Sequence, residues 1–109
     1  MAGISIKITN LIPETRRAML GRVSDAVDET AKGVKDGWQQ RAPVLTGHYR
    51  GQVKIERDGP TSATVSNNTE YGPFLEYGTV NRPARPSMTP AVETERPRFE
   101  ARLRKIERG

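Results

Sequence analysis

The N-terminal part of the chain changes from an alternating to a helical pattern of apolar positions. From Ile4 to Ile8, three isoleucines alternate with a serine and a lysine, which predicts a half-buried strand. After a break at residues 10–13, apolar residues recur every three or four positions, which predicts a long amphipathic helix of roughly 20–25 residues that ends before Pro43. Its apolar positions are Met19, Val23, Val27, Ala31, Val34 and Trp38.

The middle of the chain carries signals of a loop, a hairpin and a short helix. Residues 42–47 predict a loop, and residues 52–57 and 62–66 alternate on either side of the turn sequence Asp-Gly-Pro-Thr, which predicts a β-hairpin. Residues 71–79 hold three of the six aromatic residues. We expect this segment to supply local core and to form a short helical turn followed by a glycine-capped loop.

The C-terminal part is rich in proline, arginine and glutamate. Residues 80–90 contain three prolines, two arginines and few apolar groups, so they are expected to form an extended loop that cannot pair fully in a sheet. Thr89-Pro90 is a suitable cap and first helical position, and residues 91–109 are predicted to form a charged C-terminal helix. Pro97 is expected either to kink this helix or to start a new one.

This order of strand, long helix, hairpin and C-terminal helix predicts an α+β fold. With 109 residues the chain fits one domain, residues 1–109. Hydrophobic residues other than glycine make up 34 % of it, below the usual ~45–50 %, an average that also counts glycine. The core is therefore expected to be thin, and stability to depend partly on packing against other subunits.

Residues that usually carry chemistry are sparse. The chain has no cysteine and a single histidine, His48, which argues against thiol catalysis, thiolate metal sites and a histidine relay. Glu70 and Glu76 lie on either side of the aromatic segment, but nothing else completes a hydrolase site. The glycines form no dinucleotide-binding or Walker pattern. We therefore expect no catalytic, cofactor-binding or metal-binding residues and no enzymatic activity.

Charge and arginine content favour a binding role. The net charge of +5 comes from 18 basic and 13 acidic residues, and 13 of the basic residues are arginine, the cation that prefers interfaces. The same charge is compatible with nucleic acid, although no recognition-helix or RNA-binding signature appears. No run of ~18 apolar residues and no signal-peptide pattern is present, so neither membrane spanning nor secretion is expected.

Three segments resemble, in this order, the motifs of one family. Residues 42–50, Ala-Pro-Val-Leu-Thr-Gly-His-Tyr-Arg, look like an "aPvdTGrLr" turn. Residues 67–79, Asn-Asn-Thr-Glu-Tyr-Gly-Pro-Phe-Leu-Glu-Tyr-Gly-Thr, are similar to an "N…YA.yvE.GT" block, and residues 85–91, Arg-Pro-Ser-Met-Thr-Pro-Ala, to an "rPflrPA" segment. Following a long N-terminal helix, this set resembles the small neck and tail-completion (head–tail joining) proteins of long-tailed bacteriophages. The chain departs from the family pattern at His48-Tyr49, at Gly72-Pro73 and in its charged C-terminal extension.

The resemblance implies a subunit in which the long helix packs across a small antiparallel sheet. It also implies a homo-oligomer, a hexameric ring in the virion neck, assembled in the host cytoplasm between the head connector or stopper and the tail terminator or tail tube. DNA would occupy the lumen, and neither cofactor nor membrane is implied. The resemblance also implies that residues 80–90 form a docking loop. Subunit or partner contacts are expected at Leu75, Glu76, Tyr77, Gly78, Thr79, Arg82, Arg85 and Met88.

Other functions stay open on the sequence alone. A tail terminator or a minor capsid protein has the same size and composition, and a basic nucleic-acid-binding module has the same charge. These alternatives differ in what they predict: overlong or missing tails without a terminator, separated heads and tails without a joining protein, and a steep salt dependence for a nucleic-acid binder.

Overall fold

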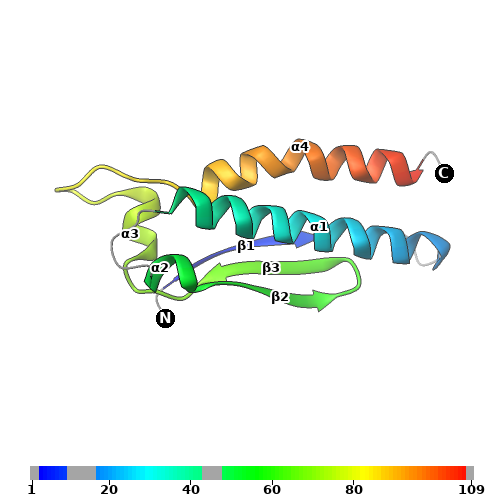
Figure 1. The fold of residues 1–109 in the computed structure, drawn as a ribbon, viewed down its shortest axis with the longest axis horizontal. Coiled ribbons are helices and arrows are strands. Elements are labelled where there is room, and N and C mark those ends of the chain that lie inside the picture. The colour runs from blue at the N-terminus through cyan, green and yellow to red at the C-terminus, as the bar shows by residue number, and fades with distance from the viewer. Residues whose placement is uncertain (1–2, 10–16, 43–47, 108–109) are drawn as a thin grey trace.

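The computed structural model describes residues 3–9, 17–42 and 48–107, and these form three layers (Figure 1). A three-stranded sheet is one layer, the long helix α1 lies across it, and α4 packs on the opposite side of α1 (Figure 1). The predicted α+β fold, with a long helix on an antiparallel sheet and a C-terminal helix, is confirmed. In chain order the elements are β1 (Ile4–Thr9), α1 (Arg17–Arg41), α2 (His48–Gly51), β2 (Val53–Gly59), β3 (Ser62–Asn67), α3 (Gly72–Tyr77) and α4 (Met88–Glu107).

The sheet is antiparallel throughout, in the order β1-β3-β2. Val65 of the central strand β3 pairs with Ile6 of β1 on one side and with Ile55 of β2 on the other. Because side chains alternate across a strand, these residues share the face that α1 covers. The predicted first strand and the hairpin are confirmed, with an irregularity between Arg57 and Gly59 next to the hairpin turn.

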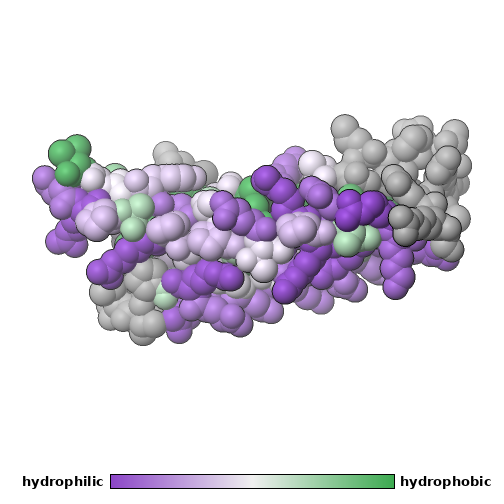
Figure 2. Space-filling model, turned by 90° about the horizontal axis from the view of Figure 1, so that it is seen from above, coloured by the Kyte–Doolittle hydropathy of each residue, from purple (hydrophilic) through white to green (hydrophobic). Residues whose placement is uncertain are grey.

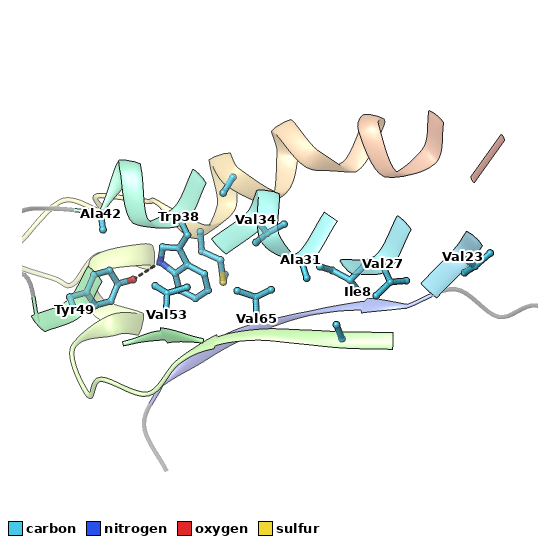
Figure 3. Packing of buried hydrophobic residues seen from close by; sticks show 13 residues of the cluster. Ile8, Val23, Val27, Ala31, Val34, Trp38, Ala42, Tyr49, Val53 and Val65 are labelled. Atoms are coloured by element: carbon cyan, nitrogen blue, oxygen red, sulfur yellow. Dashed lines mark hydrogen bonds between the residues drawn. The ribbon is translucent and has the colours of Figure 1, made fainter. Parts of the chain in front are cut away.

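The predicted apolar stripe of α1 forms the main core. Its valines, alanine and tryptophan point at the sheet, where Ile8, Val53 and Val65 meet them (Figure 3). Trp38 is completely buried and is the largest side chain of this core. The helix has 25 residues, as the pattern predicts, and ends at Arg41, just before Pro43. The buried apolar residues of α1 are Val23, Ala26, Val27, Ala31, Val34 and Trp38.

A second stripe of α1, made of small residues, faces α4. A Cβ placed on Gly37 would lie 3.1 Å from the Cβ and 3.6 Å from the Cα of Ala91. A Cβ on Gly33, one turn earlier, would overlap the carboxyl group of Glu95. The two helices therefore approach closely because α1 has no side chain at these two positions.

An ionic cluster around the buried Glu95 completes the contact between α1 and α4. Glu95 is only 4 % exposed, and its carboxylate accepts hydrogen bonds from Arg98 (2.8 Å) and Arg102 (3.5 Å). Arg102 also reaches α1, where it pairs with Glu29 (3.1 Å) and donates to the Thr30 hydroxyl (2.9 Å). A buried carboxylate needs such partners because its desolvation is otherwise costly. The cluster ties α4 to one register on α1.

The ends of the elements differ from the prediction in a few places. Helix α4 begins at Met88 and continues through Pro97, so no new helix starts there. Pro97 and Glu93 are both exposed, so the carbonyl that loses its helical partner lies on the solvent-facing side, where water can bond it. The one-turn helix α2 was not predicted. The predicted breaks at residues 10–13 and 43–47 lie outside the described residues.

Candidate functional site

The three family-like segments meet at one end of the elongated molecule (Figure 1). Helix α2, the stretch from the end of β3 through α3, and the start of α4 lie there side by side, although they are far apart in the sequence. They are joined by side-chain hydrogen bonds that reach across 11 to 18 residues of sequence. This end of the molecule is the candidate functional site.

Asn67 joins α2 to the segment that leads into α3. It is completely buried, and its Nδ2 donates to the Tyr49 carbonyl (2.7 Å). Its Oδ1 accepts from the backbone N–H (3.0 Å) and the hydroxyl (2.7 Å) of Thr69. A buried amide with satisfied donors and acceptors specifies a single geometry, because any other arrangement would leave polar groups unpaired.

Tyr49 connects this end of the molecule to the core. Its hydroxyl accepts a hydrogen bond from the indole N–H of Trp38 (3.0 Å; dashed in Figure 3). Its ring packs at 5.7 Å from the ring of Tyr71, tilted by 41°. Burial raises the pKa of Tyr49 above the ordinary value because the phenolate would lose its hydration, and the hydrogen bond from Trp38 opposes this only in part.

This raised pKa predicts a loss of stability in alkali. Below the ordinary pKa of about 10 both folded and unfolded chains carry the neutral phenol, and above it only the unfolded chain ionises readily. The free energy of unfolding should therefore fall as the pH rises through the folded-state pKa of Tyr49. Tyr49→Phe should lower the stability at neutral pH and flatten this decline. Urea unfolding between about pH 8 and pH 11 measures both; an equal decline in the two proteins would contradict the prediction.

Glu76 holds the start of α4. Its carboxyl group is buried, at 3 % exposure of the residue. Oε1 accepts the backbone N–H groups of Ser87 (3.0 Å) and Met88 (2.9 Å), and Oε2 accepts that of Thr89 (2.8 Å). Ser87 directly precedes α4, and Met88 and Thr89 lie in its first turn, where the N–H groups otherwise lack acceptors; the negative charge also suits this end of the helix dipole.

Residues 78–87, here called the arm, project from the body between α3 and α4 (Figure 1). Gly78 has φ +81°, and a Cβ there would lie 2.9 Å from the Ala84 nitrogen, so glycine suits the bend. At the tip, the Thr79 N–H donates to the Arg82 carbonyl (2.9 Å) and the Arg82 N–H to the Thr79 hydroxyl (3.1 Å). At the base, the Arg85 N–H donates to the Leu75 carbonyl (2.6 Å). The arm is therefore a preformed loop.

The structure divides the predicted contact residues into two groups. Glu76 and Met88 are buried inside the molecule, and Leu75 packs partly against the core. The other five, which lie at the end of α3 and along the arm, are partly or fully exposed: Tyr77, Gly78, Thr79, Arg82 and Arg85. It stays a prediction that all eight residues bind other subunits or partners. The buried residues among them lie beneath the arm and support it.

The expectation that the aromatic segment supplies local core was wrong for most of its side chains. Phe74 is 59 % exposed and Tyr77 66 % exposed, while Leu75 alone of the expected core residues packs against the buried cluster. The reason is that Trp38 and Tyr49 already fill the core at this end. Helix α3 places Gly72 close to the Tyr49 ring and leaves Phe74 and Tyr77 exposed.

His48, Glu70 and Glu76 are the residues that the sequence offers as candidates for chemistry. His48 is exposed on α2, Glu70 is exposed before α3, and Glu76 is engaged by backbone N–H groups. Within residues 3–9, 17–42 and 48–107, no group of three or more histidine, aspartate or glutamate side chains is placed to hold a metal ion. No described helix is long and apolar enough to cross a membrane.

A preformed, exposed loop held by a rigid scaffold is a common place for binding residues. Residues 19–78 match the family described as "Bacteriophage HK97-gp10, putative tail-component". The match covers more than half of the chain, which therefore belongs to this family of bacteriophage tail components. The resemblance to phage neck and tail-completion proteins is confirmed. No curated protein and no solved structure matches the chain.

Proposed function

We propose that this tail component is a structural subunit of the phage neck and has no enzymatic activity. Six copies form a ring that completes the tail and joins it to the DNA-filled head, next to the head connector or stopper and the tail terminator or tail tube. Assembly takes place in the host cytoplasm. The observation that carries the proposal is the convergence of three separate sequence segments on one exposed, preformed arm.

The buried polar contacts beneath the arm support a binding role. Glu76 and the Leu75 carbonyl bind the arm at Ser87 and Arg85, while Asn67 and Tyr49 fix the segment before α3 and helix α2 through hydrogen bonds to each other and to Trp38. Little ordering is therefore needed when a partner binds. The low fraction of hydrophobic residues in the chain is consistent with a subunit that gains stability in an assembly. A ring would present such an arm once per copy, and repeated weak contacts add to a strong attachment.

Electron microscopy of a lysate from phage that lack this protein tests the proposal. Full heads and finished tails, separate from each other, are the expected result. Supplying the wild-type gene from a plasmid is the control and should restore joined particles. Normal joined particles in the absence of the protein would overturn the proposal.

A tail terminator is the second candidate, because the family description places the chain in the tail. The same micrographs separate the two functions: overlong or missing tails would support the terminator. A minor capsid protein would instead change the heads. A nucleic-acid-binding module would show an affinity for DNA that falls steeply with salt, whereas a neck ring with DNA in its lumen needs no tight DNA binding.

A further inference from the structure

Among the described residues, the most exposed large apolar side chains gather at one end of the molecule. In the part of the chain that the structure describes, every exposed large hydrophobic side chain lies between residues 71 and 80. The space-filling view shows hydrophobic surface at the tip of the end that carries the arm (Figure 2). This set, called the apolar end, consists of Tyr71, Phe74, Tyr77 and Val80.

The tip of the arm presents its apolar side chain without support from the body. Val80 is completely exposed, although the residues around it are held by the Thr79–Arg82 turn. A fixed loop with a fully exposed valine, following a helix with two exposed aromatic side chains, Phe74 and Tyr77, has the composition of an interface core. Single exposed apolar residues need no explanation, but four of them within ten residues at one end of the molecule do.

Ring symmetry limits what this end can meet. In a cyclic ring each subunit contacts its neighbour through two different surfaces. The apolar end would therefore need a second apolar surface elsewhere on the same chain. Outside the apolar end, no exposed large hydrophobic side chain is found among the described residues. Of the large apolar side chains on α4, Val92, Phe99, Leu103 and Ile106 are only partly exposed. The described part of a neighbouring copy thus offers no comparably exposed apolar set, which favours a partner of a different kind.

The charge around the apolar end defines the chemistry of that partner. Arg82 and Arg85 are both exposed on the arm, and neither forms an ion pair within the described part of the chain. Arginine at an interface rim is matched by carboxylates, which it can bind through two parallel hydrogen bonds. The fitting surface is an apolar cleft with aspartate or glutamate side chains at its edge.

We propose that the apolar end and the two arm arginines dock into an acidic-rimmed apolar cleft on a different virion protein, so that the arm links one ring to the next and does not link copies within a ring. The inference rests on the proposed neck function and specifies its partner. Self-association then uses another surface of the chain.

The test compares self-association with attachment. One variant combines Val80→Asp with Arg82→Glu, both at exposed positions of the arm. The matched control combines Ala101→Asp with Lys54→Glu, which makes the same charge changes at exposed positions of α4 and β2. Light scattering gives the oligomer mass, and co-sedimentation measures binding to heads and tails purified from a lysate that lacks this protein.

The arm variant should keep the oligomer mass of the wild type and bind heads or tails about tenfold more weakly or worse, while the control variant behaves as the wild type. A lower oligomer mass for the arm variant would overturn the proposal, because the arm would then meet a second copy. Unchanged binding of the arm variant would also overturn it. If the wild-type protein binds neither heads nor tails, the neck function itself is contradicted. This result can be told apart from the two results for the arm variant.

Discussion

Replacing Glu76 by alanine should destabilise the protein by about 3–5 kcal/mol, a large part of the ~5–15 kcal/mol typical of a domain. The carboxylate accepts three backbone N–H groups, and those of Ser87 and Met88 belong to buried residues. Without an acceptor, each buried N–H costs about 1–3 kcal/mol. Urea unfolding followed by circular dichroism measures the loss.

Two further variants show that the effect comes from the hydrogen bonds. Glu76→Gln keeps one acceptor oxygen and should lose only part of the stability. Glu70→Ala removes an exposed carboxylate from the same segment and should change the stability by less than about 0.5 kcal/mol. If Glu76→Ala and Glu70→Ala unfold at the same urea concentration, Glu76 does not hold the start of α4.

Replacing Gly37 by leucine should separate α4 from α1. The new side chain would have to occupy the space of Ala91, whose backbone cannot move without displacing the helix. Overpacking of this kind typically costs about 1–3 kcal/mol, and more where backbone must shift. Because the Glu95 cluster depends on the same approach of the two helices, its bonds should weaken as well. Hydrogen exchange of the α4 amides should become faster.

Gly21 provides the matched control for this prediction. It lies on the same helix, and a Cβ there would meet nothing within 4 Å. Gly21→Ala should therefore stabilise the protein by up to about 1 kcal/mol through helix propensity alone. If Gly37→Leu is as stable as the wild type, the close contact of α1 with α4 is not what holds α4 in place.

The sequence pattern predicts those elements whose burial follows a regular period. The isoleucines of β1, the alternation of the hairpin and the apolar stripe of α1 all repeat at the spacing of their element, and each is found as predicted. The second stripe of α1 gives no periodic signal in the hydropathy pattern, because glycine, the residue at positions 33 and 37, is neither strongly apolar nor charged. Their spacing of one turn is a signal for close helix packing.

The candidate site was predictable in its location but not in the roles of its residues. The segments around Glu76 and Arg85 were singled out, yet the carboxylate of Glu76 is buried because the start of α4 returns to it eleven to thirteen residues later. The exposure of Phe74 depends on a core that other segments already fill. Asn67 and Tyr49 form their hydrogen bond across 18 residues of sequence, a contact that no local pattern shows.

The match to the family ends at Gly78, where the arm begins. The part of the chain that belongs to the family thus supplies α3 and the buried base at Asn67 and Glu76. The arm and α4 follow it. If the arm binds the partner as proposed, substitutions in the arm would alter that binding without changing the base, because the base holds the arm mainly through backbone groups.

The most direct test of the central claim is complementation in vitro. Purified wild-type protein is added to a lysate of phage that lack it, and the joined and infectious particles are counted by electron microscopy and plating. Wild-type protein and the Ala101→Asp/Lys54→Glu control should convert separate heads and tails into infectious particles, and the Val80→Asp/Arg82→Glu protein should not. Equal restoration by the arm variant would contradict the claim that the arm makes the joining contact.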